Sequence, residues 1–348
     1  MLALTVAPGT KGSARLDEVA EPDPARGEIL IAAHSVGICG TDREIIDGLH
    51  GAAPPGGDRL ILGHESLGRV LEVPAGRDLA IGDWVAGIVR HPDPVPCASC
   101  AHGEWDMCAN GRYLEHGIKG LDGFAAERYR LDAGFVVKVD PDLAERGVLI
   151  EPASVVAKAW DQIDRIGRRA FWAPSRVLVI GAGPIGLLAA LLGVQRGLEV
   201  HVLDRHTEGP KPGIVRDLGA TYHSGSVEEA GSADIILECT GAPALIVEAL
   251  HAARPNGIVC LTGVSAPGKK MPVDTGALNR ELVLENNVVF GSVNANRAHY
   301  DQGALALRRA DPRWLDRLIT RRVPLADWAT ALEHRPDDVK TVLRFGDL

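Results

Sequence analysis

The stretch Val177-Leu178-Val179-Ile180-Gly181-Ala182-Gly183-Pro184-Ile185-Gly186 decides the fold of the second half of this sequence. Its four leading apolar residues predict a buried strand, and the G-x-G-x-x-G pattern after them opens a helix over 184–196. Gly181 permits the tight turn, Gly183 lets the backbone approach a pyrophosphate, and Gly186 lets the helix pack closely on the strand. Pro184 and Ile185 begin that helix, whose free N–H groups favour an anion. The stretch therefore predicts a dinucleotide-binding turn.

The end of the next predicted strand, 200–204, indicates which dinucleotide binds. Asp204 ends this strand, where a carboxylate accepts hydrogen bonds from the adenosine ribose hydroxyls and repels a 2′-phosphate. This favours NAD. Arg205 and His206 follow at once and are able to pair with a 2′-phosphate, so NADP stays open. The glycine hexapeptide alone also fits a turn in any α/β fold, and the strand, helix and terminal carboxylate together favour dinucleotide binding.

Strands and helices alternate around this motif, which predicts a parallel sheet with right-handed crossovers. After the helix over 184–196 we expect a helical segment near 215–218, a helix over 244–253 ended by Pro255-Asn256-Gly257, and strands at 234–239, 258–262 and 288–293. The first 150 residues instead read as short strands, among them 28–36, 67–73, 84–89 and 135–139. From about Arg297 the alternation stops, and 315–343 reads as helices plus a short final strand.

Length and charge narrow the class of protein. A chain of 348 residues favours two domains, and 37 basic against 46 acidic residues give a net charge of −9, which predicts no nucleic-acid partner. The stretch 177–194 is uncharged and just long enough for a membrane-spanning helix, but its glycines and Pro184 split it into a strand and a helix. Residues 1–12 lack the pattern of a secretory signal. We expect a cytoplasmic protein with no membrane partner.

Two groups of residues in the first half predict metal sites. Cys39, His64 and Glu65 offer a thiolate, an imidazole and a carboxylate, the kind of set that holds a catalytic zinc ion with one position open. Glu151, at the inferred hinge between the two halves, is a later acidic candidate, and a hinge is where substrate and cofactor would meet. The alternative for Cys39 alone is a buried packing residue.

The second group is the local cluster Cys97, Cys100 and Cys108, which predicts a structural zinc ion. Such sites use four ligands, and only three thiolates are present. Asp93 is the expected fourth ligand, with His91 and His102 as alternatives. The remaining alternative is a lobe without zinc that carries three unpaired thiols.

Together these motifs resemble the zinc-dependent medium-chain alcohol dehydrogenase superfamily, and within it the glucose (aldose) 1-dehydrogenases. The resemblance covers nearly the whole chain and is carried by the stretches 37–44, 62–68, 97–108, 113–120 and 291–294 with His299-Tyr300. The stretch 113–120 and the strand Ser292-Val293-Asn294 are its most specific parts, because they separate aldose enzymes from other alcohol dehydrogenases. It implies an α/β chain with a GroES-like β-rich catalytic domain, 1–155 and 296–348, and a Rossmann domain with a doubly wound parallel sheet, 156–295. It also implies a homodimer or homotetramer, with 288–293 as a candidate edge strand.

The resemblance assigns further roles, residue by residue. The catalytic zinc ligands would be Cys39, His64, Glu65 and the movable Glu151. Sugar contacts would fall on Thr41, Glu115, Glu151, Asn294 and His299, and cofactor contacts on Gly183–Gly186, Asp204–His206, Gly263, Val264, Ser265, Ser292, Val293 and Asn294. The implied reaction is hydride transfer from C1 of an aldose such as D-glucose to NAD(P)⁺, giving the lactone. Zinc would act as the Lewis acid, with Thr41 passing the proton outward and Glu65 or Glu151 accepting it.

Three positions depart from the family pattern. Glu44 stands where many alcohol dehydrogenases carry a proton-relay histidine, Asp93 replaces the first cysteine of the lobe, and Val89 stands where some relatives carry a sugar-binding asparagine. The last change predicts relaxed aldose selectivity. Because Cys39, His64 and Glu65 do not themselves identify the substrate, a polyol or secondary-alcohol dehydrogenase is the alternative enzyme. A non-catalytic NAD(P)-binding protein is the alternative from another class.

Overall fold

The chain divides into two compact units. A computed structural model describes residues 1–266, 268 and 270–346, with a first unit of Met1–Ser154 and Asn294–Leu348 and a second unit of Val155–Val293. The sequence puts the two limits after residues 155 and 295. The observed limits assign Asn294 to the first unit.

The second unit is built on a six-stranded, all-parallel sheet in the order β14-β13-β12-β15-β16-β17. Residues 177–180 have no exposed surface, as expected of a central strand covered on both faces. This confirms the predicted doubly wound parallel sheet. The strands are β12 (Arg176–Ile180), β13 (Glu199–Leu203), β14 (Thr221–His223), β15 (Ala233–Glu238), β16 (Ala253–Leu261) and β17 (Val288–Gly291).

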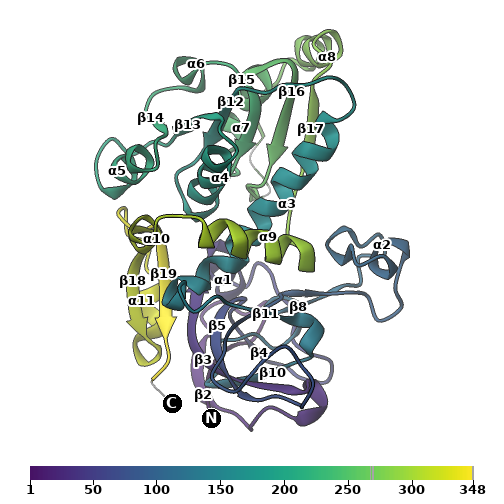
Figure 1. The fold of residues 1–348 in the computed structure, drawn as a ribbon, viewed down its shortest axis with the longest axis vertical. Helices are drawn as coiled ribbons and strands as arrows, with labels where there is room; N and C mark the ends of the chain where they lie inside the picture. The colour runs from purple at the N-terminus through teal and green to yellow at the C-terminus, as the bar shows by residue number, and fades with distance from the viewer. Residues whose placement is uncertain (267, 269, 347–348) are drawn as a thin grey trace. The chain divides into compact units, whose positions relative to one another are not determined.

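Helices lie against this sheet (Figure 1). They are α3 (Ile150–Gly167), α4 (Pro184–Gln195), α5 (Pro210–Asp217), α6 (Val227–Ala230), α7 (Pro243–His251) and α8 (Thr275–Leu284), and α3 runs across the limit between the units. Helix α4 packs on β12 and β13, whereas α7 packs on β15 and β16. Each crossover thereby covers the strands that it connects.

The glycines of the β12–α4 turn have different tasks. Gly181 has φ +106°, a conformation that L side chains rarely adopt. A Cβ added to Gly186 would lie 1.8 Å from the carbonyl oxygen of Gly181, so this position needs glycine for close packing. A Cβ on Gly183 meets nothing within 4 Å. Gly183 caps α4 without a side chain, which leaves the first N–H groups of the helix unpaired by a cap.

Two of the expected elements are wrong. Pro255-Asn256-Gly257 does not separate a helix from a strand, because α7 ends at His251 and β16 already begins at Ala253. The register jumps from the pair Ala233–Ala253 to Ile235–Ile258, so the three residues form a bulge inside the strand. In the C-terminal tail, β18 (Ile319–Pro324) forms a strand where the sequence predicts helix.

The first unit is a β structure with three sheets. The largest has the order β11-β6-β5-β3-β19-β18, with β10 also paired to β3, and all pairs are antiparallel except β18 with β19. The smaller sheets have the orders β2-β1-β4 and β7-β8-β9. The strands are β1 (Leu2–Val6), β2 (Arg15–Glu18), β3 (Ile29–Ile38), β4 (Leu60–Ile61), β5 (Glu65–Glu72), β6 (Trp84–Gly87), β7 (Arg90–His91), β8 (Leu114–His116), β9 (Gly120–Leu121), β10 (Arg128–Leu131), β11 (Val136–Lys138) and β19 (Lys340–Arg344).

The helices of the first unit are short apart from α9. They are α1 (Gly40–Ile46), α2 (Ala98–Ala101), α9 (Arg297–Arg308), α10 (Pro312–Leu318) and α11 (Trp328–Leu332), with 3₁₀ helices η1 (Pro24–Arg26), η2 (Trp105–Met107), η3 (Ala133–Phe135), η4 (Ala144–Leu149) and η5 (Leu325–Asp327). The segment with α2 and η2 stands out from the rest of this unit (Figure 1). Because β19 pairs with β3, the C-terminal tail completes the sheet of the first unit.

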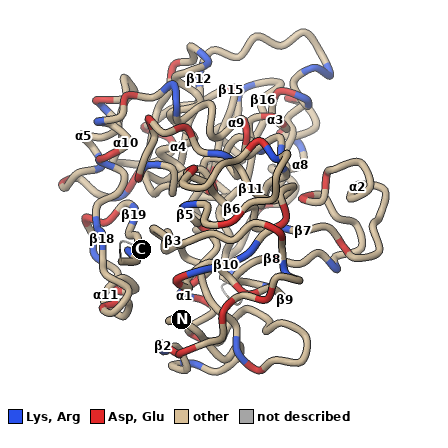
Figure 2. The backbone as a smooth tube through the Cα atoms, turned by 60° about the horizontal axis from the view of Figure 1, so that its bottom comes forward, with Lys and Arg blue, Asp and Glu red and all other residues tan. Residues whose placement is uncertain are grey.

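Charged residues of both signs are interspersed along both units (Figure 2). Among the described residues, no helix combines the length and the apolar character that a membrane crossing requires.

The glycine turn gives a prediction on stability. The change Gly186→Ala should lower the free energy of unfolding by at least about 2 kcal/mol, because the new methyl group overlaps a carbonyl oxygen. The matched control Gly183→Ala should change it by less than about 1 kcal/mol. Urea unfolding followed by far-ultraviolet circular dichroism measures both, and equal losses in the two variants would contradict the assignment.

Candidate metal centre and its polar surroundings

Cys39 is fixed at the junction of β3 and α1. Its thiol accepts a hydrogen bond from the Thr41 backbone N–H (3.2 Å), and the Asp42 carboxylate accepts one from the Cys39 backbone N–H (2.9 Å). These two contacts form a capping box at the start of α1. The strand end and the helix cap together hold the sulfur in one place. The Thr41 residue itself is half-buried.

His64 lies directly opposite this thiol. Its Nε2 is 3.0 Å from the Cys39 Sγ, and its Nδ1 is 3.3 Å from Oδ1 of Asp42. Burial alone would lower the pKa of His64, but the negative charge of Cys39 and Asp42 outweighs it and raises that pKa well above its usual value. A buried position that stabilises the protonated imidazole this strongly also stabilises a metal cation. A carboxylate behind the second ring nitrogen is the usual support of a metal-binding histidine.

Glu65 belongs to the same cluster but is engaged by Lys340. One ligand atom each from Cys39, His64 and Glu65 lies within 4.8 Å of the other two. Both carboxylate oxygens of Glu65 also accept hydrogen bonds from the Lys340 ammonium group, at 2.6 Å each. Lys340 lies on β19, is 2 % exposed, and also donates to the Ile38 carbonyl (3.2 Å). Glu65 is therefore held as the partner of a buried lysine.

Glu151 lies in the first turn of α3 and is buried. It is outside the group of mutually close ligand atoms formed by Cys39, His64 and Glu65. Burial is the main reason that the pKa of Glu151 rises to about 7, and the negative charge of Glu65 adds to the effect. This carboxyl is thus able to gain or lose a proton near neutral pH.

A buried polar network occupies the same unit. Arg90 pairs with Glu115 at 3.0 Å, and the Asn294 amide donates to the same carboxylate at 2.7 Å. Asn296 donates to Asp106 at 2.9 Å, and the Asn296 backbone N–H lies 3.3 Å from Nδ1 of His299. Tyr300 accepts a hydrogen bond from the Val89 backbone N–H at 3.1 Å. Burial raises the pKa of Tyr300 well above its usual value, and the negative charges of Glu151 and Glu65 add to this.

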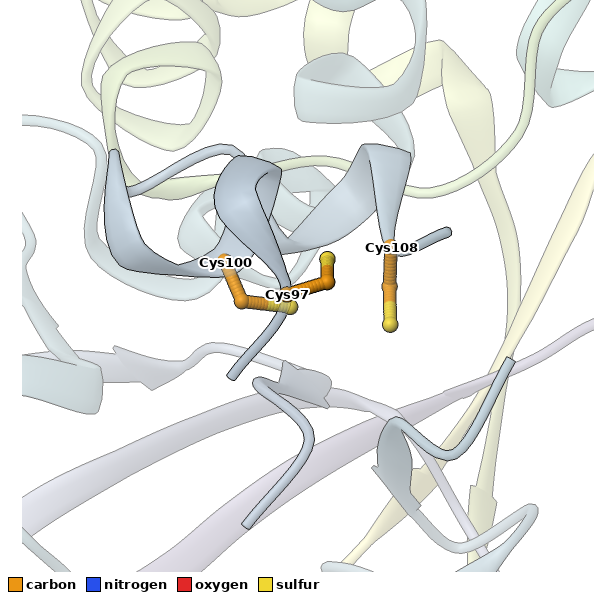
Figure 3. A group of neighbouring side chains, drawn as sticks. All are labelled: Cys97, Cys100 and Cys108. Carbon is orange, nitrogen blue, oxygen red and sulfur yellow. The ribbon is translucent and has the colours of Figure 1, made fainter. Parts of the chain in front are cut away.

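The three lobe cysteines converge, but the expected fourth ligand does not join them. The thiols of Cys97, Cys100 and Cys108 lie within 4.8 Å of one another, and Figure 3 shows them leaving the α2–η2 segment on one side. Hydrogen bonds from backbone N–H groups lower the pKa of Cys97 to about 6, which favours a thiolate. The Asp93 carboxylate instead accepts hydrogen bonds from the Val95 backbone N–H, Asn110 and Arg112.

The two alternative histidines are also engaged elsewhere. His91 contacts His116 through the Nε2 atoms at 3.1 Å and stacks on Phe135, with the ring centroids 3.6 Å apart. Nδ1 of His102 lies 2.7 Å from the Ala98 carbonyl oxygen. In the described chain the lobe therefore presents three thiols without a fourth side-chain ligand, and the spacing of the cysteines alone could not show this.

The predicted cofactor residues lie in the second unit, except for Asn294. Oδ2 of Asp204 accepts a hydrogen bond from the Ala182 backbone N–H at 2.8 Å and lies 3.3 Å from the Lys211 ammonium group. Burial opposes ionisation of Asp204, but the hydrogen bonds from His206 and Ala182 outweigh it, so the pKa of Asp204 is lowered. The Arg205 side chain is exposed.

Two more features of this unit fit a dinucleotide. The hydroxyl of Ser292 is buried with no partner among the described residues, and the uncapped N-terminus of α4 follows Gly183. Gly263 packs against the Gly241 backbone, and the Ser265 hydroxyl donates to the Gly241 carbonyl at 2.7 Å. The side chains of Val264 and Val293 are largely exposed.

Family models match both parts of the chain. The model described as the alcohol dehydrogenase GroES-like domain matches residues 25–141, and the model described as the glucose dehydrogenase C-terminus matches residues 144–345.

Individual relatives are similar along their full lengths. The chain is 42 % identical to glucose 1-dehydrogenase 2 of Vulcanisaeta moutnovskia, with 99 % of each chain covered, and 40 % identical to the glucose 1-dehydrogenase of Methanocella arvoryzae, with 99 % and 100 % covered. The solved structure of Haloferax mediterranei glucose dehydrogenase in complex with NADP, Zn and gluconolactone has a TM-score of 0.92 at 32 % identity, with both chains fully covered.

The buried Glu151 predicts a pH dependence of stability in the metal-free protein. Its pKa of about 7 in the folded chain exceeds the ordinary value of 4.5. The protonated carboxyl stabilises the folded chain fully below about pH 4.5, and this stabilisation is lost as the pH rises through 7. The reason is that the same carboxyl ionises at a lower pH in the unfolded chain than in the folded chain. Relative to Glu151→Gln, the wild type should lose about 3 kcal/mol of unfolding free energy across this range.

Urea unfolding in a chelator at a series of pH values measures this difference. The exposed Glu208, which has no ion pair among the described residues, provides the control Glu208→Gln, which should follow the wild-type profile. Parallel profiles for the wild type and Glu151→Gln would contradict a raised pKa.

Proposed function

The chain belongs to the glucose dehydrogenase family of zinc-dependent, medium-chain alcohol dehydrogenases, and on that premise we propose that it oxidises an aldose at C1 with NAD(P)⁺. D-Glucose, giving gluconolactone, is the first candidate. The observation that carries the proposal is the Cys39–His64 pair, whose facing sulfur and nitrogen atoms lie in a chain similar to glucose dehydrogenases from end to end. A protein that only binds nucleotides would have no use for this pair.

We propose that Cys39 and His64 hold the zinc ion, with Glu65 or Glu151 as a carboxylate ligand. When bound, Zn²⁺ supplies Lewis-acid chemistry, lowering the pKa of a hydroxyl from about 15.7 towards about 7. NAD(P)⁺ supplies the hydride acceptor. Glu65 must leave Lys340 to become a ligand, whereas no described lysine donates a hydrogen bond to the Glu151 carboxylate.

The remaining groups bind and orient the substrate or move its proton. The pKa of Glu151, about 7, suits a proton acceptor at neutral pH, and Thr41 lies beside Cys39 to pass a proton outward. Glu115, Asn294 and His299 are the proposed sugar contacts. Hydrogen-bonding groups that are buried in this way penalise a substrate that lacks the matching hydroxyl.

For the cofactor we propose NAD as the preferred form. The Asp204 carboxylate is kept at the end of β13, where it is able to accept hydrogen bonds from ribose hydroxyls. Lys211 beside it partly offsets its charge, which explains how a 2′-phosphate would be tolerated. The relative from Haloferax mediterranei contains NADP, so both cofactors need to be measured.

We also propose a homodimer or homotetramer that pairs through β17, in a cytoplasmic location. Strand β17 is the last strand of its sheet, and α8 near it in sequence buries none of its side chains, with Val283 and Leu284 largely exposed. Exposed apolar residues next to a free strand edge favour association with a second copy. All six cysteines are free thiols, a state that a reducing compartment maintains.

A panel of substrates tests the proposed reaction. Glucose, galactose, xylose, sorbitol and 2-butanol are each assayed with NAD⁺ and NADP⁺, and we expect an aldose to have the highest kcat/KM. Higher kcat/KM with sorbitol or 2-butanol would favour the polyol or secondary-alcohol enzyme. The preference for NAD is wrong if kcat/KM with NADP⁺ is more than about tenfold higher, equivalent to about 1.4 kcal/mol.

Metal content tests the two zinc sites. The change Cys39→Ala should remove about one zinc ion per chain and abolish turnover, while NADH binding measured by fluorescence persists. Undiminished turnover in this variant would refute the zinc mechanism. We expect about two zinc ions per wild-type chain, and a value near one would leave the lobe of Cys97, Cys100 and Cys108 without metal.

A further inference from the structure

The two oxygens of the Glu115 carboxylate have unequal surroundings. Oε1 accepts hydrogen bonds from Nε of Arg90 at 3.0 Å and from the Asn294 amide at 2.7 Å. A terminal guanidinium nitrogen of Arg90 also lies 3.0 Å from Oε1. Oε2 has no partner among the described residues and is not one of the fully buried atoms that lack a partner. One oxygen is thus saturated, while the other is still able to accept a hydrogen bond.

This geometry differs from an ordinary structural pair in the same unit. Arg128 contacts Glu21 with Nε on Oε2 at 2.7 Å and Nη2 on Oε1 at 2.6 Å, using both carboxylate oxygens. Such a two-pronged arrangement is the favourable one for an arginine and a carboxylate. Arg90 instead places both of its nitrogens on a single oxygen of Glu115. The guanidinium therefore makes no hydrogen bond to Oε2, which stays available as a hydrogen-bond acceptor.

Arg90 is itself held rigidly. It is 5 % exposed, its Nη1 donates to the Asp106 carbonyl at 3.1 Å, and its guanidinium carbon lies 3.7 Å from the centre of the Tyr113 ring. The Lys119 ammonium group is 4.1 Å from the centre of the same ring. Burying an ion pair is costly and is weak evidence for stability alone. An arginine that is held in place and donates to one carboxylate oxygen is instead expected where that carboxylate must keep a fixed orientation.

We propose that Arg90 is a positioning residue: by saturating Oε1 of Glu115 it fixes Oε2 as the acceptor that reads one hydroxyl of the sugar. This rests on the proposed function. Asn294 donates to the same oxygen from the segment before α9, so it helps to hold Glu115 in the same orientation. Selectivity among aldoses then depends on contacts that do not themselves touch the sugar.

Deoxy sugars measure this effect. The holoenzyme is assayed with glucose and with its 2-, 3-, 4- and 6-deoxy analogues, varying sugar at saturating cofactor. In the wild type, loss of the hydroxyl that Oε2 accepts should lower kcat/KM by about 10- to 100-fold, since a hydrogen bond to a charged group contributes about 1.5–3 kcal/mol. In Arg90→Gln, the penalty for that one analogue should fall to less than about threefold, mainly through a raised KM for glucose.

Two further variants separate positioning from folding. Arg90→Lys keeps the charge and should retain part of the discrimination, so it serves if Arg90→Gln does not fold. Arg128→Gln removes the comparison pair and should leave every sugar ratio unchanged. Calorimetric titration of glucose into the enzyme with NADH should show the same loss of discrimination in binding, independent of turnover.

The outcomes are distinguishable. If the wild type oxidises no aldose, the proposed function itself is overturned. If the wild type discriminates but the Arg90 variants weaken all sugars by the same factor, Arg90 has only a structural role and the inference is wrong. If no single deoxy analogue is penalised in the wild type, Glu115 does not read a hydroxyl.

Discussion

The buried ion pair of Lys340 and Glu65 is the contact on which the first unit depends. Both side chains are almost fully buried, and the ammonium group touches both carboxylate oxygens. A buried carboxylate that lost this partner would cost several kcal/mol, so neither residue is replaceable alone. Lys340 also reaches the Ile38 carbonyl at the end of β3, one residue before Cys39. The pair therefore fixes the strand end from which the thiol projects.

Three buried side chains of this unit are each supported by a second charged residue. Asp42 lies behind His64, Lys340 behind Glu65, and Arg90 behind Glu115. In each case a residue with no proposed contact to metal or substrate holds one that is proposed to bind the metal or the substrate. Low dielectric surroundings make these supports strong and also make their loss expensive. The unit thereby uses buried polar groups to fix the directions of its reactive side chains.

The sequence predicted the features that depend on local pattern. Alternating strands and helices gave the parallel sheet, and the family resemblance carried by Cys39, His64 and the glycine turn is confirmed by relatives at about 40 % identity. Contacts between distant segments were missed. Lys340 lies 275 positions from Glu65, and no local pattern links them. A buried lysine at the start of an apolar strand was the available signal.

Local contacts explain other differences between expectation and structure. Pro255-Asn256-Gly257 has the composition of a turn, yet Ala253 before it and Ile258 after it both pair with β15, so it forms a bulge within β16. Asp93 stays a predicted zinc ligand, but the structure does not place it among the mutually close ligand atoms of the lobe, and its carboxylate accepts hydrogen bonds from Arg112 and Asn110. Which partner a side chain contacts depends on the three-dimensional structure, and the spacing of residues along the chain does not reveal that partner.

The discontinuity of the first unit has a consequence for synthesis on the ribosome. Every strand of the parallel sheet is available once residue 291 has been made, whereas β3 must wait for β19 at residues 340–344. Pairing across so many residues is intrinsically slow. Until residues 340–344 leave the exit tunnel, Glu65 lacks its lysine and β3, the strand before Cys39, lacks its pairing with β19. The surroundings of the candidate metal-binding cluster are therefore completed after the strands of the parallel sheet have been made.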